Sequence, residues 1–174
     1  IANHKPVNFI GFHHFFSFFY KGSLASNLIT TIHEDANGVI WVGTGNGLHK
    51  MKETVDKGMG DFTSEKIPLH TTAEDTITDK FINVIASGIN NDLWVGTFAG
   101  LFKLNTAGDK SVQAEWYSRK NERLSDIYVF AITVDRSGRV WSGGRNGLDV
   151  IDVATGKRVL FSKTGTDQEG MVAN

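Results

Sequence analysis

Two aspartates are the residues of this chain whose type and spacing best fit acid–base chemistry. Asp35 and Asp135 occupy matching places in a sequence repeat, and glycoside hydrolysis requires two carboxylates that face one bond, about 5–10 Å apart. Equivalent turn residues in different repeats do not converge on one bond, however, and a turn aspartate accepts hydrogen bonds from the backbone two residues on. We therefore expect both carboxylates to stabilise turns, and we assign no catalytic residue.

Histidine and cysteine give no metal site. His13 and His14 are adjacent on an expected strand and would point to opposite faces. The remaining histidines, which show no ligand spacing, are His4, His33, His49 and His70. The absence of Cys excludes a disulfide framework and Cys-ligated zinc, and no phosphate loop, zinc motif or nucleophile elbow appears. We expect no metal, no cofactor and no enzyme activity in this segment.

The composition is that of a folded domain without a nucleic-acid partner. Of the 174 residues, 40% are hydrophobic and 21% are charged, so a packed core can form. The net charge is −1 and the 18 Lys and Arg are scattered, whereas nucleic-acid binding normally needs a basic stripe. The stretch Phe9–Tyr20 is too short and too polar for a membrane span. We expect a buried aromatic strand pair there, and we identify no signal peptide.

A sequence repeat organises most of the chain. Trp41, Trp94 and Trp141 fall 53 and 47 residues apart. The stretches 32–47, 85–100 and 132–147 align without a gap as IHEDANGVIWVGTGNG, IASGINNDLWVGTFAG and ITVDRSGRVWSGGRNG. A period of this length indicates one supersecondary unit stacked on copies of itself, because a single unit is too small to bury its own apolar face.

Each copy carries the signals of four short strands. A β-rich run comes first, a turn of Asp, Asn or Gly follows, and the second strand carries the Trp. A Gly-ended turn leads to a third strand, and a candidate fourth lies in the variable stretch beyond. The predicted strands are 28–34, 39–44, 48–51 and 62–69, then 81–87, 92–97, 101–104 and 112–118, then 128–134, 139–144, 148–151 and 158–162.

Four antiparallel strands per repeat are typical of a propeller blade. We predict an all-β fold, a β-propeller fragment with about three recognisable four-stranded blades plus partial flanking strands, cut from a longer array. Residues 1–23 are assigned to outer strands of a preceding or closing blade. The blades are predicted at 24–76, 77–123 and 124–170, with 171–174 opening a truncated next blade.

The residues shared by the copies are expected to hold the blades together. The tryptophans should pack between blades, and Trp116, which is outside the repeat register, should also pack rather than bind. The glycines are expected to serve turns. The structural residues of the repeat are Trp41, Trp94, Trp141, Gly43, Gly96, Gly143, Gly47, Gly100, Gly147, Asp35 and Asp135.

The pattern resembles the two-component regulator propeller repeat, which reads roughly Leu-x-x-Asn, a strand, Asp-x-x-Gly-x-(Leu/Ile)-Trp-(Val/Ile)-Gly-Thr, two variable residues and Gly-Leu. The first copy fits throughout with Leu24, Asn27, Asp35, Gly38, Ile40–Thr44 and Gly47–Leu48. The second copy departs at its first turn (Gly88, Asn91), and the third has Ser142–Gly144 in place of Val-Gly-Thr.

The resemblance implies a role in signal transduction. Members of that family form the periplasmic or extracytoplasmic sensor part of membrane histidine kinases, often hybrid systems of gut Bacteroidetes that respond to carbohydrate fragments. The implied partners are an oligosaccharide ligand and the remaining blades and downstream signalling domains of the same chain. A protein-interaction or dimerisation scaffold, which would make a homo-oligomer, remains an alternative, and a propeller-type polysaccharide lyase or glycosidase is a third.

One face of the propeller is the candidate recognition surface. The loops between second and third strands share this face with the segments that lead into each blade, and one column of positions varies as Gly45, Phe98 and Arg145. We predict that Phe98 stacks on a ligand and Arg145 binds an acidic or hydroxyl group. Asn46 and Asn146 would add hydrogen bonds. Ordinary solvent-exposed loops are the alternative interpretation.

Overall fold

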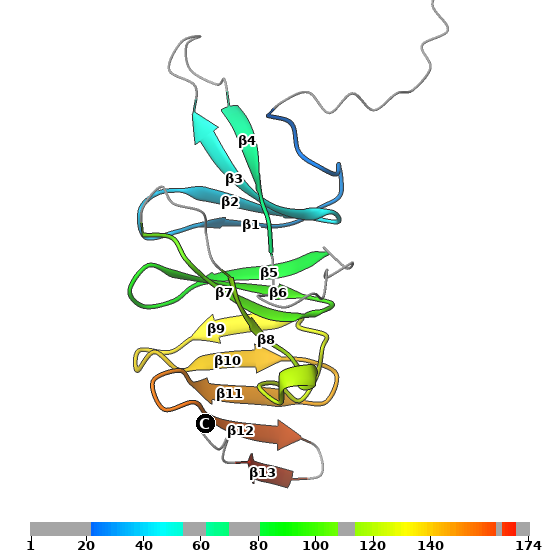
Figure 1. Ribbon diagram of the computed structural model, residues 1–174, viewed down its shortest axis with the longest axis vertical. Helices are drawn as coiled ribbons and strands as arrows, with labels where there is room; N and C mark the ends of the chain where they lie inside the picture. The colour runs from blue at the N-terminus through cyan, green and yellow to red at the C-terminus, as the bar shows by residue number, and fades with distance from the viewer. Residues whose placement is uncertain (1–21, 54–61, 70–80, 108–113, 163–164, 170–174) are drawn as a thin grey trace, which may run out of the picture.

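Three antiparallel sheets lie side by side along the length of the molecule (Figure 1). The computed structural model describes residues 22–53, 62–69, 81–107, 114–162 and 165–169. The predicted all-β propeller fragment with repeated antiparallel blades is confirmed. The predictions for Phe9–Tyr20, for the blade limit at 76–77 and for 171–174 fall outside the described residues, and the blade limits remain predictions.

Each sheet uses consecutive strands in chain order. The first sheet runs β1-β2-β3-β4, the second β5-β6-β7-β8 and the third β9-β10-β11-β12-β13. The first two consist of β1 Ile29–Glu34, β2 Ile40–Thr44, β3 Gly47–Glu53 and β4 Phe62–Ile67, then β5 Ile82–Ser87, β6 Asp92–Thr97, β7 Gly100–Asn105 and β8 Ala114–Tyr117. The third consists of β9 Ala131–Val134, β10 Val140–Gly143, β11 Leu148–Asp152, β12 Lys157–Ser162 and β13 Gly165–Glu169, and a 3₁₀ turn η1 spans Arg119–Asn121.

The fifth strand of the third sheet was not expected from the sequence. Strand β13 pairs with β12 along its length, whereas the repeat predicted one strand after β11. A sheet edge has unpaired backbone groups, and a hairpin that folds back on β12 satisfies them. The extra strand therefore extends the outer edge without changing the four strands that repeat.

The repeat keeps one pairing register in all three sheets. Trp41 pairs with His33 on one side and Lys50 on the other, and Trp94 pairs with Ala86 and Lys103. Trp141 pairs with Thr133 and Val150, which are the equivalent positions of the third copy. Because a slip of one residue would turn every side chain to the opposite face, each indole points in the same sense.

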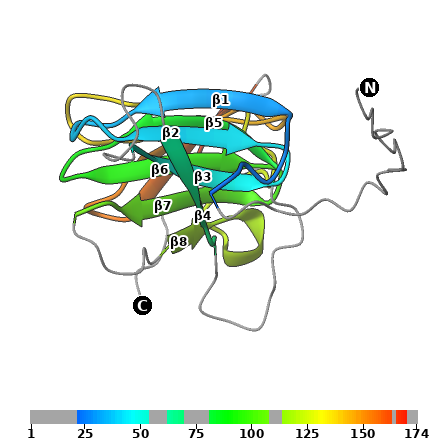
Figure 2. The ribbon, with the colours of Figure 1, turned by 90° about the horizontal axis from the view of Figure 1, so that it is seen from above.

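The sheets pack through these indoles. Trp41 lies in a buried cluster with Ile82, Ile85 and Leu93 of the second sheet. Trp94 lies in the matching cluster with Val129, Val140 and the other core residues of the third sheet, whereas Trp141 is half-buried. The view from above shows the strands of the second sheet running alongside those of the first (Figure 2).

The opposite face of each sheet receives the indole of the sheet before it. Ile85 is 6% exposed and shares a buried cluster with Trp41, and the equivalent Ile132 packs against the cluster around Trp94. Ile32 holds the same position in the first sheet and is 67% exposed. The first and third sheets thus present complementary faces, one with an exposed Ile and one with a half-buried Trp.

Two glycines are required by the approach of the next sheet. Gly43 and Gly96 lie inside β2 and β6 rather than in turns, which corrects the expectation that the glycines serve turns. A Cβ on Gly43 would lie 2.6 Å from Ile82 Cγ2, and one on Gly96 would lie 2.6 Å from Val129 Cγ1. At Gly143 the nearest atom would be Ala131 Cβ at 3.5 Å. Gly43 and Gly96 are also crowded within their own sheets, since the same Cβ atoms would lie 2.5 Å from Thr31 Cγ2 and 2.7 Å from Val84 Cγ1. Both glycines therefore make room for the next sheet and for a side chain of the neighbouring strand.

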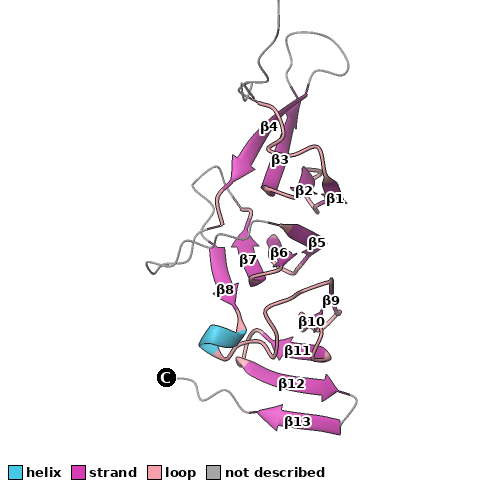
Figure 3. Ribbon diagram, turned by 90° about the vertical axis from the view of Figure 1, so that its right-hand side faces the viewer, coloured by secondary structure: helices cyan, strands magenta, loops and turns pink. Residues whose placement is uncertain are grey.

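The inner strands β1, β5 and β9 line up on one side of the molecule (right in Figure 3). His33 Nε2 and Ser87 Oγ form a hydrogen bond of 2.7 Å between β1 and β5. The amide of Asn83 donates to the carbonyl of Val129 at 2.9 Å, and the Val129 N–H donates to the carbonyl of Thr97. Polar bonds thus fix how neighbouring sheets sit against each other.

Trp94→Ala should lower the free energy of unfolding by about 3–5 kcal/mol, because it empties a buried contact between two sheets. Trp141→Ala is the matched control. It should cost clearly less, because the Trp141 side chain is only half-buried. Chemical denaturation followed by circular dichroism measures both, and equal costs would contradict packing between sheets as the role of the tryptophan.

Candidate ligand-binding face

The turns between second and third strands are fixed by buried threonines. Thr44 Oγ1 donates to the carbonyl of Gly47 at 2.9 Å and accepts from the N–H of Asn46 at 3.1 Å. Thr97 Oγ1 makes the same pair of bonds, to the carbonyl of Gly100 and from the N–H of Ala99. Each hydroxyl bonds to backbone groups inside its turn, so the backbone of the turn is fixed and the side chains at its tip can face away from the sheet.

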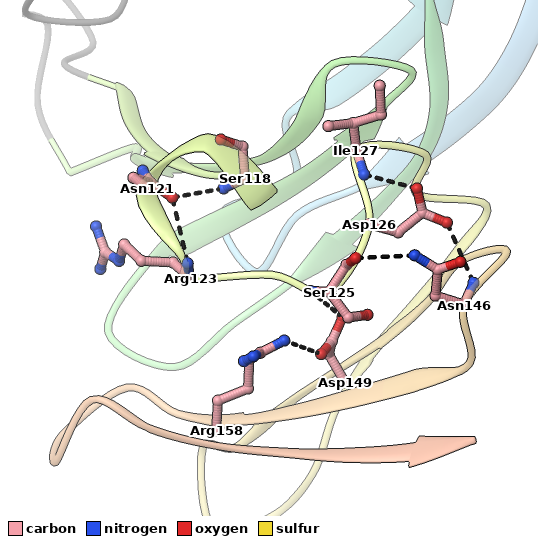
Figure 4. A network of polar contacts seen from close by, with 9 residues as sticks. All are labelled: Ser118, Asn121, Arg123, Ser125, Asp126, Ile127, Asn146, Asp149 and Arg158. Carbon is pink, nitrogen blue, oxygen red and sulfur yellow. Dashed lines mark hydrogen bonds and ion pairs between the residues drawn. The ribbon is translucent and has the colours of Figure 1, made fainter. Parts of the chain in front are cut away.

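The third turn replaces the threonine with an aspartate from the segment before β9. Gly144 stands where the threonine would be. Asp126 Oδ2 accepts from the N–H of Arg145 at 2.7 Å and from the N–H of Asn146 at 3.2 Å, and Figure 4 shows the second of these bonds. Asp126 Oδ1 accepts from the two backbone N–H groups that follow it. A Cβ on Gly144 would lie 2.7 Å from the carbonyl oxygen of Tyr128. The departure from the repeat pattern is therefore compensated by Asp126.

Asn46 and Asn146 tie these turns to the segment leading into their own sheet. Asn146 Nδ2 donates to the carbonyl of Ser125 at 2.9 Å (Figure 4), and Asn46 Nδ2 lies 3.5 Å from the carbonyl of Ala25. Both side chains are exposed. Each amide therefore has one bond inside the protein, and a contribution to a ligand would come from its other hydrogen or its oxygen.

Buried polar side chains on β3 and β11 bond to the backbone of the segments that lead into the first and third sheets. The N–H of Ala25 donates to His49 Nε2 at 3.1 Å, and the N–H and Oγ of Ser125 donate to Asp149 Oδ2 at 3.1 and 2.7 Å. Burial lowers the pKa of His49, which keeps the ring neutral and able to accept. Arg158 pairs with Asp149 at 3.0 Å, and both side chains are buried (Figure 4).

Four aromatic rings gather where the second and third sheets meet on this face. Phe98 stacks on Phe81 with centroids 4.8 Å apart and an interplanar angle of 13°. Its edge contacts are with Tyr128 at 5.7 Å and Phe130 at 6.1 Å, and these two rings lie nearly parallel at 6.4 Å. Phe130 is 47% exposed. We call these four rings, together with Arg145, the rim cluster.

Arg145 completes the rim cluster as its cation. Its guanidinium carbon lies 3.7 Å from the ring centroid of Tyr128, in cation–π contact. The residue is exposed, and within the described residues its guanidinium forms no ion pair with a carboxylate. The structure thus joins Phe98 and Arg145, two of the four predicted ligand residues, through Tyr128, and it leaves Asn46 apart on the first sheet.

Sequence reasoning missed Phe81, Tyr128 and Phe130. A signal was present, because Leu28, Phe81 and Tyr128 are equivalent positions that also vary between copies. Each of these residues contacts the variable turn residue of its own sheet, which is Gly45, Phe98 or Arg145. The pairs are Leu28 with Gly45, whose N–H donates to the Leu28 carbonyl at 2.9 Å, Phe81 with Phe98, and Tyr128 with Arg145.

The two repeat aspartates lie at the opposite end of the strands. Asp35 Oδ1 accepts from the N–H groups of Asn37 and Val39, and Oδ2 accepts from the indole of Trp41 at 2.8 Å. Burial raises the pKa of this carboxyl, but the Trp41 bond and the backbone bonds outweigh it and hold the pKa below its usual value. Both oxygens are thus occupied by the scaffold.

Asp135 repeats this arrangement in the third sheet. Its carboxylate accepts from the backbone of Ser137 and Arg139, and Oδ2 lies 3.0 Å from the indole nitrogen of Trp141. The Trp141 bond contributes most to lowering the pKa of Asp135 to about 2. The first and third copies thus share a carboxylate–indole bond that the sequence did not indicate, whereas the second copy has Gly88 in place of the aspartate.

The described residues contain no group of three or more His, Asp or Glu side chains placed to hold a metal ion. Among the same residues, no helix has the length and apolarity needed to cross a membrane.

Trp116 donates from its indole to the carbonyl of Ala99 at 2.9 Å and packs on the core of the second sheet.

Comparison with protein families agrees with the repeat. Residues 23–46 match the family described as two component regulator propeller, so the chain carries a repeat of this family, as the sequence resemblance predicted. A search of curated proteins gave no match.

Solved structures share the fold. The extracellular domain of BT4673 of B. thetaiotaomicron, described as a hybrid two component system, matches with a TM-score of 0.63 and 20% identity over 82% of this chain and 21% of that one. The extracellular domain of BT3049 from the same organism, with the same description, matches with a TM-score of 0.62 and 22% identity over 81% and 19%. This chain therefore spans about a fifth of the length of these structures.

Trp141→Phe should raise the pKa of Asp135 from about 2 towards its ordinary value of 3.8, because it removes the hydrogen bond that lowers the pKa most. A carbon-detected NMR titration of the side-chain carboxyls measures the midpoint. Trp41→Phe serves as the control and should leave the Asp135 midpoint unchanged. An unmoved midpoint in Trp141→Phe would show that the indole does not hold this carboxylate.

Proposed function

We propose that this chain is a non-catalytic, ligand-sensing propeller module of a bacterial two-component sensor that responds to carbohydrate. The observation that carries the proposal is the rim cluster. It places aromatic rings and a cation on the face formed by the turns between second and third strands, which we call the loop face, at positions that vary between copies of the repeat. The family match and the shared fold with extracellular domains of two component systems support the sensor role.

The chemistry of the rim cluster suits a sugar. Aromatic faces pack well against the apolar faces of sugar rings, and the polar tips of such residues add hydrogen bonds. Phe130 is half-exposed and lies beside the edge of Phe98, so open ring surface is available at the junction of two sheets. A ligand lying across this junction would contact both sheets at once.

The sensor would transmit a change in the relative placement of neighbouring sheets. A ligand shifts a conformational equilibrium only by its differential affinity for the two states, and the rim cluster has residues from two sheets. Ligand contact there would favour one relative placement of the sheets. Further blades and downstream signalling domains would receive the change, and the module would act on the extracytoplasmic side of the membrane.

A protein-interaction scaffold is the second candidate, favoured by the exposed apolar faces of the outer sheets. Ile32 is 67% exposed on the first sheet, and Trp141 is half-buried on the third. A scaffold would use these faces and would be indifferent to the rim cluster. The two functions therefore separate by which variants affect binding.

Phe98→Ala should weaken saccharide binding about tenfold or more, because it removes the ring that touches three others of the rim cluster. Glycan-array screening of the 174-residue chain finds the ligand class, and calorimetric titration of the best hit gives the affinity. Phe62→Ala, at an exposed phenylalanine of outer strand β4, is the matched control and should bind as the parent does.

Thermal unfolding of both variants shows that a loss of binding is not a loss of fold. Binding of no saccharide, or equal binding by Phe98→Ala and the parent, would overturn the carbohydrate-sensing role. Self-association that Ile32→Asp abolishes would then favour the scaffold.

A further inference from the structure

We propose that the saccharide is anionic, with a carboxylate or sulfate group on a ring, and that Arg145 is the residue that selects it. This inference rests on the proposed function of the rim cluster and specifies its ligand class. It starts from the position of one guanidinium, whose carbon lies over the ring of Tyr128, 3.7 Å from the ring centroid.

Stacking on a ring uses the face of a guanidinium and leaves its edge available. The N–H donors of arginine lie in the plane of the group, in a fork that matches the two oxygens of a carboxylate or sulfate. Contact with Tyr128 therefore fixes the Arg145 group without consuming its donors. Less rotamer freedom remains to be lost when an anion binds, which is preorganisation.

The carboxylate that bonds to the Arg145 backbone has its oxygens occupied by backbone groups. Asp126 is buried and accepts from four backbone N–H groups, among them those of Arg145 and Asn146. It thus holds the Arg145 backbone, while the guanidinium extends over Tyr128 instead. Arg158, by contrast, is buried and pairs with Asp149 at 3.0 Å.

The three sheets differ systematically along this face, which gives the ligand a direction. The pair of equivalent positions is Leu28 with Gly45 in the first sheet, two phenylalanines in the second, and Tyr128 with Arg145 in the third. The side-chain chemistry thus changes from aliphatic to aromatic to aromatic plus cationic. A ligand would place its charged group over the third sheet and a sugar ring towards the second.

The test compares matched ligands on the full chain. A glycan array with neutral, uronate-containing and sulfated oligosaccharides sorts the hits by charge, and calorimetry compares the best anionic hit with its uncharged counterpart, the methyl ester of a uronate or the desulfated sugar. We expect the anionic form to bind at least about tenfold more tightly. Its affinity should fall as salt is raised, because exposed charges are screened.

Arg145→Gln should remove this preference, because it should weaken binding of the anionic ligand at least about tenfold more than binding of the uncharged counterpart. Arg136→Gln, in the exposed β9–β10 turn at the far end of the strands, is the matched control and should change neither affinity. The uronate and sulfate arms identify which anion the site takes.

The failures are distinguishable. Neutral saccharides bound as tightly as anionic ones, with Arg145→Gln unchanged and Phe98→Ala impaired, would overturn the anionic ligand and leave the proposed function standing. Indifference to every saccharide would overturn both. Equal loss of charged and uncharged ligands in Arg145→Gln would mean that Arg145 only shapes the rim cluster, and this too would overturn selection by charge.

Discussion

The packing of one tryptophan against the next sheet is the contact on which this structure depends. Trp41 lies in one buried cluster with Ile85 of the second sheet, and Trp94 lies in the equivalent cluster with residues of the third. Gly43 and Gly96 permit the approach, because a side chain there would collide with the neighbouring sheet. A four-stranded sheet alone buries too little surface to be stable, so each unit is stabilised by its neighbour.

The residues that stabilise the scaffold are separate from the side chains on the loop face, and this separation explains why the loop face is free to vary. The strands, the inter-sheet indoles and the carboxylate–indole bonds fix the scaffold, and buried side chains under the face fix the turns. Asp126 shows that the third turn keeps the shape of the first, since it accepts from the N–H of Asn146 as Thr44 accepts from the N–H of Asn46. Side chains that point outward from a turn of constant shape can change without cost to the core, and the rim cluster consists of such side chains.

Much of the scaffold could be predicted from the sequence, because a gapless repeat reports both strand order and register. The spacing of the tryptophans predicted three equivalent sheets, and the Asp-x-x-Gly turns predicted hairpins. Phe98 and Arg145 could be singled out because their column varies. Their meeting through Tyr128 could not, since it joins two sheets across a distance that no local pattern encodes. Strand β13 was also missed, because it is not part of the repeat.

A double-mutant cycle tests the central contact most directly. Trp41 and Ile85 share a buried cluster across the first two sheets, and residues in contact show coupling energies of about 0.5–3 kcal/mol. Truncating each to Ala, alone and together, should give coupling in this range when unfolding free energies are compared. Trp141 and Ile32 have the same residue types on the two outer faces, and their coupling should be near zero. Coupling near zero for Trp41 and Ile85 as well would contradict the account.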